Sequence, residues 1–537
     1  MALFLDNSLS ESSFINKSPF PFSLILSLSL SLCAVMVEET KIAAAAAASA
    51  EVSKTEEKTP PASYVPEAED GKKPFKEDTN LQSVSFKEES NLVADLLDPE
   101  KKILNELKQL IQAAIANNEF NPSPNKSEKP SKNTEAKTEE PVPPKTENPP
   151  AAQEEAVADD DGAKTVEAIA ETVVPPHAAT VADEEKTSCA AEEVFLWGVP
   201  LLGSEKSDTV LLKFLRARDF KAKEALVMIK NAVIWRKQFG VEALLEEDVA
   251  FLELEKVVFY HGKDKDGHPV CYNVYGEFQD QELYDKVFGD EEKMEKFLKW
   301  RILLLEKGIR KQLNFEPGKV CTLVQVTDLK NVPGPGKKEL RQATKKALAL
   351  LQDNYPEFVA KQVFINVPWW YLAYNMFMSR FFSQRTKSKF VFAGPSKSAE
   401  TLFKYIAPEF VPIQYGGMSK HNDADFSTDD TVNEITLKPS NTHFIEFPVS
   451  QPCLLFWELR VLAWDVSYGA EFTPSDEGAY TVILQKVRKL TSIDEPYVKN
   501  SFKASQPGKI VITIDNVTTK KKKLLYRWKT KASTEST

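Results

Sequence analysis

Cysteine and tryptophan are scarce in this chain of 537 residues, and they are unevenly placed. The 5 cysteines are scattered and no two form a Cys-x-x-Cys pair, which excludes a disulfide framework and a cysteine-ligated zinc site. This usage is typical of a reducing compartment. All 8 tryptophans lie at or beyond Trp197. The first third of the chain therefore differs in character from the rest.

The chain also lacks the residue patterns of common catalytic centres. It has no Gly-x-Ser-x-Gly, no His-Glu-x-x-His and no phosphate-binding loop of the Walker type, because the glycines around Gly334 are wrongly spaced. The 5 histidines are dispersed, and the turn with Asp264, Asp266 and Gly267 lacks the further ligands of a calcium loop. We expect neither enzyme activity nor a bound metal.

Residues 1–190 are predicted to form a disordered, acidic, proline-rich arm. Within it, residues 51–190 contain 15 of the 33 prolines, 30 acidic against 16 basic side chains, and only four aromatic residues. Such a segment cannot bury enough apolar area to offset the conformational entropy of the chain. The remainder, residues 191–537, carries a net charge of +5 and is expected to be compact.

One segment of the arm, near residues 88–117, breaks this pattern. Its leucines and isoleucines recur at helical spacing opposite lysine and glutamate, and Pro99 with Asp98 as its cap predicts the start of a helix. Three alternatives stay open for this helix: docking to a partner, binding to a membrane surface, or packing on the folded body. Its mixed charges argue against strong binding to anionic lipid.

A second apolar segment, Phe20–Val37, lies near the N-terminus. Its length suits a signal or anchor segment, but Asp6 and Glu11 accompany Lys17 before it, so the usual basic start is missing. Two alternatives stay open. Residues 1–35 are either a non-native or dispensable extension, with Met36 a plausible start, or a targeting segment.

Beyond residue 190, helical and strand patterns alternate, which predicts an α/β sheet. A helical subdomain is expected over 191–245 and an α/β domain over 246–420. The predicted helices are 208–219, 221–239, 293–313 and 337–353. The predicted strands are a hairpin of 256–261 and 268–274, followed by 320–328, 362–367 and 390–392.

The pattern changes after a polar linker at 419–433. Short β-rich runs follow with turn residues between them, and they predict a small all-β sandwich over 430–532. These runs are 434–437, 443–447, 453–464, 480–489 and 509–515.

A dense aromatic segment follows the strand 362–367. On a helix it has two interpretations: a core helix, or a mobile lid whose apolar side faces a lipid chain. The residues expected at the lid and the tail cavity are Trp369, Trp370, Tyr374, Phe377, Met378, Phe381 and Phe382. The following QRTKSK places cations beside this segment, where they suit a phosphate-bearing headgroup.

The order LLKFLRARDF, QVTDL, DNYPE, the aromatic segment, RTKSKF and PIQYGG resembles the CRAL-TRIO phospholipid transfer proteins over residues 195–420. The acidic arm, its helix and a C-terminal sandwich resembling a GOLD domain are similar to the plant patellins. The resemblance implies a lipid headgroup site at Arg218, Glu357, Thr386 and Lys389. Asp219 departs from inositol-lipid-binding relatives, in which a basic residue follows the arginine.

The C-terminal run VTTKKKKLLYRWK is strongly basic. Lys520, Lys521, Lys522 and Lys523 are predicted to contact an anionic membrane, because each cation near such a surface contributes roughly 1 kcal/mol. The alternative is the solvated edge of a strand.

Together these features predict a peripheral protein of the cytoplasm, at the plasma membrane or cell plate, that binds a phospholipid as its ligand and needs no other cofactor. The resemblance implies a role in membrane traffic, including cell-plate formation. Expected partners are phosphoinositides and other hydrophobic lipids, a membrane surface, and trafficking proteins that bind the arm or the sandwich, but no nucleic acid. Two rival functions stay open: a protein-recruiting adaptor with a vestigial cavity, and a carrier of a neutral hydrophobe such as a tocopherol.

Overall fold

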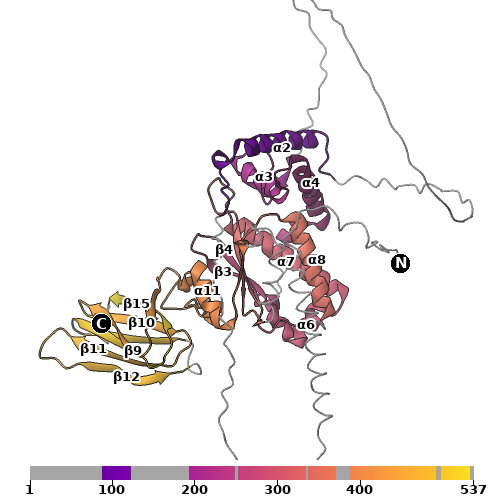
Figure 1. Cartoon of the computed structure of the whole chain (residues 1–537). Helices are drawn as coiled ribbons and strands as arrows, with labels where there is room; N and C mark the ends of the chain where they lie inside the picture. The colour runs from indigo at the N-terminus through magenta and orange to yellow at the C-terminus, as the bar shows by residue number, and fades with distance from the viewer. Residues whose placement is uncertain are drawn as a thin grey trace, which may run out of the picture. The chain divides into compact units, whose positions relative to one another are not determined.

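The structure, a computed structural model, describes residues 88–121, 193–247, 252–333, 337–369, 388–491 and 497–532. Three predictions concern residues outside the described ranges: the disorder of most of the arm, the role of the segment Phe20–Val37, and most of the lid. The described residues form helices, an α/β sheet and an all-β region, in that order along the chain (Figure 1). The predicted multidomain fold class is confirmed.

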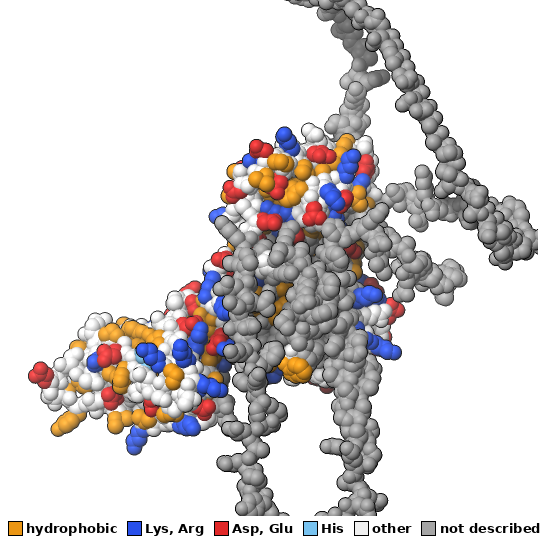
Figure 2. All heavy atoms as spheres, viewed as in Figure 1, with side chains coloured by type: hydrophobic (Ala, Val, Ile, Leu, Met, Phe, Trp, Pro, Cys, Tyr) orange, Lys and Arg blue, Asp and Glu red, His pale blue; other side chains and the backbone are white. Residues whose placement is uncertain are grey.

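The helix in the arm packs on the folded body. It is α2 (Asp98–Ala116), with Pro99 in its first turn, and it contacts α3 (Glu205–Ala217) and α4 (Ala222–Phe239). Leu104, Leu107 and Ile111 are buried in a core shared with those helices, while the outer face carries mixed charges (Figure 2). Of the three alternatives for this segment, the structure shows the third.

The helical subdomain begins with a hairpin of two-residue strands and ends with a short helix. The hairpin pairs β1 (Phe195–Leu196) with β2 (Val199–Pro200), and the short helix is α5 (Val241–Glu246). Helix α3 begins at Ser204, whose hydroxyl accepts a hydrogen bond from the Lys206 N–H and so caps the helix. Gly240 ends α4 with a φ of 72°, in the left-handed region that glycine adopts without steric cost.

The central sheet has five strands in the order β3-β4-β5-β6-β7. The β3–β4 pair is antiparallel and the other pairs are parallel. The hairpin and the three later strands were predicted, and each lies within a few residues of its predicted position. The strands are β3 (Val258–Lys263), β4 (Pro269–Asn273), β5 (Leu323–Asp328), β6 (Val359–Ile365) and β7 (Phe390–Phe392).

Helices cover both faces of this sheet, so its inner strands are buried on both sides. On one face, α11 (Ser398–Tyr405) packs against Val270, Val324 and Val363. The other face carries polar side chains from β4 and β5, and these meet α7 (Glu291–Gln312) and α8 (Lys338–Asn354). The short helix α6 (Gln281–Phe288) packs against α7.

The C-terminal region is a sandwich of two four-stranded antiparallel sheets, ordered β13-β10-β15-β8 and β12-β11-β14-β9. Its strands are β8 (Asn433–Leu437), β9 (Asn441–Val449), β10 (Cys453–Val461), β11 (Val466–Pro474), β12 (Val482–Leu490), β13 (Val498–Ala504), β14 (Gly508–Asn516) and β15 (Lys522–Ala532). The sandwich was predicted, but the run 453–464 ends early because residues 463–465 form a turn with positive φ. Strands β11, β13 and β15 were not foreseen.

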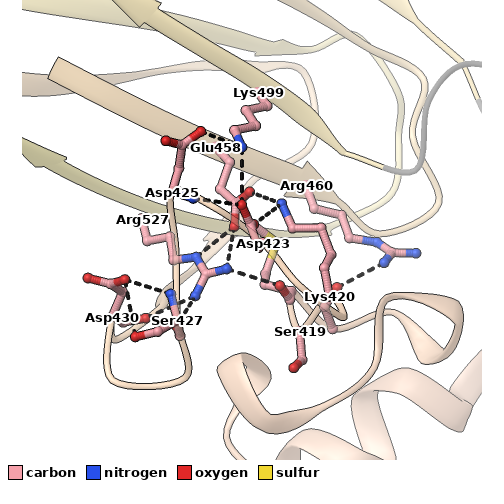
Figure 3. Close-up of polar contacts among 12 residues, drawn as sticks. Ser419, Lys420, Asp423, Asp425, Ser427, Asp430, Glu458, Arg460, Lys499 and Arg527 are labelled. Carbon is pink, nitrogen blue, oxygen red and sulfur yellow. Dashed lines mark hydrogen bonds and ion pairs between the residues drawn. The ribbon is translucent and has the colours of Figure 1, made fainter. Parts of the chain in front are cut away.

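Buried charges hold the linker against this sandwich (Figure 3). Glu458 on β10 is fully buried, and its carboxylate accepts a hydrogen bond from the Arg527 Nε at 2.6 Å. Lys420 of the linker pairs with Glu458 and, at 2.6 Å, with Asp423. Lys499 on β13 binds Asp423 from the sandwich side at 3.1 Å. Each of these charges has an opposite charge beside it.

Helix α7 is the longest helix in the part of the chain that the structure describes, and charged residues are interspersed with apolar ones along it. Neither it nor any other described helix has the length and apolar character that crossing a bilayer requires.

Candidate functional site

A cavity of about 650 Å³ opens where α3, the start of β6 and the residue before β7 meet. Most of the residues that line it are charged or polar, whereas ligand pockets are commonly lined by apolar side chains. The charged side chains in its walls are Lys213, Arg216, Asp266, His268, Lys319, Glu357 and Lys389, together with Glu88 and Glu89 from the arm.

Two of the predicted headgroup residues meet in this cavity. The Lys389 Nζ lies 2.8 Å from a carboxylate oxygen of Glu357, and both side chains are mostly buried. Glu357 has a φ of 53°, an uncommon conformation for a residue other than glycine, which places its side chain at the turn into β6. Strained backbone of this kind often marks a functional position. The role of both residues in headgroup binding stays a prediction.

The other predicted headgroup residues are placed differently. Arg218 is the residue that ends α3; its guanidinium donates to the carbonyl of Ala217 and faces Asp353, and it is not part of the cavity wall. Thr386 lies outside the described residues. Within the described residues, the cations of α3 that line the cavity are Lys213 and Arg216, and they come from the same LLKFLRAR run.

Lys213 is a buried cation that helix α3 places at the back of the cavity. Its side chain is 3% exposed, and its ammonium group donates to the carbonyls of Cys321 at 2.8 Å and Glu357 at 2.9 Å. Burial lowers its pKa below the ordinary value, despite the neighbouring Cys321, Glu88 and Glu357. An anion that approached this amine would favour its charged form.

His268 lies between two carboxylates. Its Nδ1 is 3.0 Å from Asp264, and its Nε2 is 2.8 Å from Glu88. Burial lowers the pKa of His268, but the hydrogen bonds and charges of these two carboxylates outweigh burial and raise it to about 10. His268 is therefore an imidazolium at neutral pH, and Asp264, Asp266 and His268 form an ion cluster in their turn.

A second polar cluster lies deeper, between the sheet and helices α7 and α8. Arg301 of α7 is 5% exposed, donates to Asn273 of β4 at 3.3 Å and faces Tyr275. Its Nη1 has no partner among the described residues, and it lines a small cavity of about 30 Å³ with Gln325 and Thr327 of β5. Sequence reasoning missed this cluster, although an arginine inside the apolar run WRILLL was a usable signal.

Most of the predicted lid and tail-cavity residues lie outside the described residues. Trp369 is described and is 79% exposed. Trp370, Tyr374, Phe377, Met378, Phe381 and Phe382 lie outside the described residues. Their contacts with a lipid tail stay a prediction.

The structure narrows the predicted membrane contact on the sandwich. The run Lys520–Lys523 is not one exposed strip, because Lys522 and Lys523 belong to β15, which pairs with strands on both sides. Lys522 is buried and donates to the carbonyls of Ala463 and Trp464, while Lys523 pairs with Glu434. Only Lys520 and Lys521 of this run are exposed, so only these two can serve as the predicted contact.

Comparison with known proteins assigns the two folded parts. Family models match residues 174–231 as a CRAL/TRIO N-terminal domain, 254–417 as a CRAL/TRIO domain, and 438–523 as the C-terminal GOLD domain of Patellin-1-like proteins. Fold and matches together define a CRAL/TRIO protein with a C-terminal GOLD domain.

The relatives are more specific. The chain is 48% identical to Patellin-3 of Arabidopsis thaliana over 450 residues, which cover 83% of this chain and 78% of that relative. It is 57% identical to Patellin-5 of the same plant over 352 residues, covering 65% of this chain and 51% of the relative, so it spans about half the length of Patellin-5. The chain belongs to the patellin family. A more distant match is the phosphatidylinositol transfer protein SFH5 of Meyerozyma guilliermondii, 32% identical over 182 residues, which cover 32% of this chain and 53% of that relative.

Proposed function

We propose that this chain binds a phosphoinositide, with the headgroup in the cavity beside Lys213 and Lys389, and transfers or presents it at membranes. The observation that carries the proposal is the charged cavity itself. Three cations from two separate elements, Lys213, Arg216 and Lys389, line one space, together with the imidazolium of His268. Cations that converge in a partly buried space suit a phosphate, because charge-assisted hydrogen bonds are the strong ones.

The deeper cluster around Arg301 supports a ligand that extends into the fold. A guanidinium stays charged in a protein, and Arg301 has no carboxylate within ion-pair distance among the described residues. Burying such a charge is costly unless an anionic or strongly polar group approaches it. A lipid whose polar groups reach both sites would compensate both sets of cations.

Further support for a lipid comes from the family and from one relative. The CRAL/TRIO match covers the whole sheet, and one relative is a phosphatidylinositol transfer protein by name. The proposed membranes are those of vesicle traffic, including the cell plate of dividing cells, and this part rests on the resemblance to patellins alone. Localisation of the tagged chain in dividing plant cells tests it, and a signal that never reaches the cell plate would refute it.

The lipid itself is tested by transfer between vesicles. The full chain should move phosphatidylinositol and its phosphates from donor to acceptor vesicles faster than it moves phosphatidylcholine. The choline cation of the latter offsets its phosphate, whereas phosphates on the inositol ring add anionic groups for Lys213 and Lys389. Transfer of neutral hydrophobes only would favour the carrier of an uncharged molecule. Transfer of nothing, with no lipid in the purified protein, would favour the adaptor.

A further inference from the structure

The arm enters the charged cavity and forms one of its walls. Residues 88–92 line it, and Glu88 reaches furthest into the site already described. One Glu88 oxygen lies 2.8 Å from the His268 Nε2, and the other accepts a hydrogen bond from the Thr322 hydroxyl at 2.6 Å. Glu89 pairs with Arg216 at 3.0 Å. Two carboxylates of the arm therefore bind cations that would otherwise face a ligand.

The groups around Glu88 make a site for an anion. His268 and Lys213 are both more than nine-tenths buried, and the charge of Lys213 acts on Glu88. Two protons of the Lys213 ammonium group go to carbonyls, and the group also contacts the Cys321 side chain and the Phe358 ring, so an entering anion would replace these weaker contacts. Thr209, one turn earlier on α3, is fully buried in the cavity wall, and its hydroxyl has no hydrogen-bond partner among the described residues. Glu88 uses two of the donors in this wall, His268 and Thr322, and the Thr209 hydroxyl adds one that Glu88 does not use.

The balance of charge in the cavity depends on the arm. With Glu88 and Glu89 in place, four acidic side chains face five basic ones, Lys319 included, when His268 is protonated. Without them, two acidic side chains remain, Asp266 and Glu357, and the cavity wall becomes more strongly basic. Asp264, hydrogen-bonded to the other nitrogen of His268, offsets one positive charge but does not restore neutrality.

The attachment of the arm allows residues 88–90 to leave while α2 stays packed. Asn91 is fixed to the turn before β5, because its side-chain oxygen accepts from the Gly318 N–H at 2.7 Å and its amide donates to the Lys319 carbonyl at 3.0 Å. Helix α2 is anchored separately by its buried leucines. Apart from two bonds of the Ser90 hydroxyl within the arm, to Asp95 and from the Leu92 N–H, residues 88–90 depend on polar contacts at the cavity, which water or another anion can replace.

We propose that His268, Lys213, Thr322 and Thr209 form a phosphate subsite, and that Glu88 is its internal competitor. The ligand is a phosphate monoester or diester group, carried by a lipid headgroup or by a free inositol phosphate. Its binding displaces residues 88–90 from the cavity. This inference rests on the proposed function, because it concerns regulation of the same site.

The test compares the wild-type full chain with Glu88→Gln, which keeps the shape of the side chain and removes its charge. The matched control is Glu106→Gln on the exposed face of α2. Affinity is measured by calorimetry for inositol 1,4,5-trisphosphate and for inorganic phosphate, and by sedimentation for vesicles that contain phosphatidylinositol 4-phosphate. Hydrogen exchange of residues 88–92 is followed with and without each probe.

Glu88→Gln should bind the trisphosphate roughly tenfold more tightly, the factor expected when a charge-assisted hydrogen bond of a competitor is removed. Glu106→Gln should bind as wild type does. Thr209→Val, which keeps the side-chain shape, should weaken binding roughly threefold through loss of one donor. Exchange at residues 88–92 should rise when the trisphosphate or the vesicles are added.

Equal affinity of wild type and Glu88→Gln would overturn the inference and leave the proposed function standing, provided that the wild type still transfers phosphatidylinositol. Arm exchange that rises with inorganic phosphate but not with vesicles would overturn the lipid headgroup as the source and assign the subsite to a free phosphate. If no probe binds and no lipid is transferred, the proposed function and this inference both fail.

Discussion

Two sets of buried charges in this molecule differ in how they are neutralised. Under the GOLD sandwich, Glu458, Arg527 and Lys420 lie beside opposite charges, and Asp423 and Lys499 extend the network (Figure 3). In the CRAL/TRIO part, the Lys213 ammonium group is bound by two carbonyls and lies over the Phe358 ring, and Arg301 retains a nitrogen without a partner among the described residues. Internal pairing is sufficient for holding two segments together, whereas a binding site must leave charge for its ligand.

The largest effect is expected from removing one member of the paired cluster. Glu458→Gln leaves Arg527 and Lys420 without their shared carboxylate between the linker and the sandwich, so it should lower the free energy of unfolding by about 3–5 kcal/mol. Urea denaturation measures this change. The control Glu446→Gln breaks an exposed pair with Lys509 and should cost less than about 1 kcal/mol. Equal losses in both variants would show that the buried cluster is not special.

The opposite result is expected from Arg301. Arg301→Met removes a buried charge that lacks a carboxylate, so the free energy of unfolding should stay within about 1 kcal/mol of wild type or rise. Phosphatidylinositol transfer should fall roughly tenfold. The contrast is Arg236→Met in the helical subdomain, which removes the nearest ion-pair partner of the fully buried Glu306 and should destabilise strongly. A destabilised Arg301→Met with normal transfer would make Arg301 a structural residue.

Lys389 tests the cavity itself. Lys389→Met should lower phosphatidylinositol transfer roughly tenfold, because a charge-assisted contact to the headgroup is lost. Its side chain is mostly buried beside Glu357, so a modest loss of melting temperature is also expected. Lys397→Met, in an exposed pair with Glu400, is the control and should change neither quantity. Normal transfer by Lys389→Met would remove this residue from the site.

The two clusters should respond to pH in opposite directions. The pKa of His268 is raised from 6.5 to about 10, so its contribution to holding the arm is complete below pH 6.5 and is lost as the pH rises toward 10. Burial raises the pKa of Asp423, but hydrogen bonds from Lys420 and the Asp425 N–H outweigh this and lower it, so its contribution is lost only in acid, below its ordinary value of 3.8. Hydrogen exchange should show residues 88–92 opening near pH 9–10 before the sandwich changes. An arm that opens in acid first would contradict this order.

The smallest effect is expected at the membrane contact. Lys520→Gln with Lys521→Gln should reduce sedimentation with phosphoinositide vesicles, and the wild-type binding should weaken with salt as the Debye length falls from about 10 Å at 0.1 M to about 3 Å at 1 M. The contrast is Lys522→Gln, which should destabilise the sandwich because Lys522 is buried. Equal pelleting at both salt concentrations would mean that the exposed lysines make no electrostatic contact.

The sequence predicted the elements whose pattern is strong. Strands β5 and β6 read as continuous apolar runs and α8 as a clean helical period, so their positions came out within a few residues. Strands β13 and β15 were missed because lysine and asparagine interrupt the first, and the second begins inside the run of four lysines, Lys520–Lys523. The lysine run was interpreted as exposed surface, but Lys522 is buried and its ammonium group donates to the carbonyls of Ala463 and Trp464.

The candidate site shows the same limit. The pair of Glu357 and Lys389 was found because family motifs mark both positions. Glu88 and His268 were not, because 180 positions separate two residues that belong to no common motif. Their contact depends on how α2 packs, and the sequence left that packing open among three alternatives. Contacts between charged residues far apart in the chain produce no periodic pattern in the sequence, so they cannot be predicted from it.

The lipid that the protein retains after purification tests the central claim most directly. Mass spectrometry of the chloroform–methanol extract of the full chain, set against an extract of the Lys389→Met variant, identifies it. The account predicts phosphatidylinositol or its phosphates in the wild type, enriched over the host membrane, and a lower occupancy in the variant. An extract that holds only neutral hydrophobes, or no lipid in either protein, would contradict the assignment of the charged cavity to a phosphate-bearing headgroup.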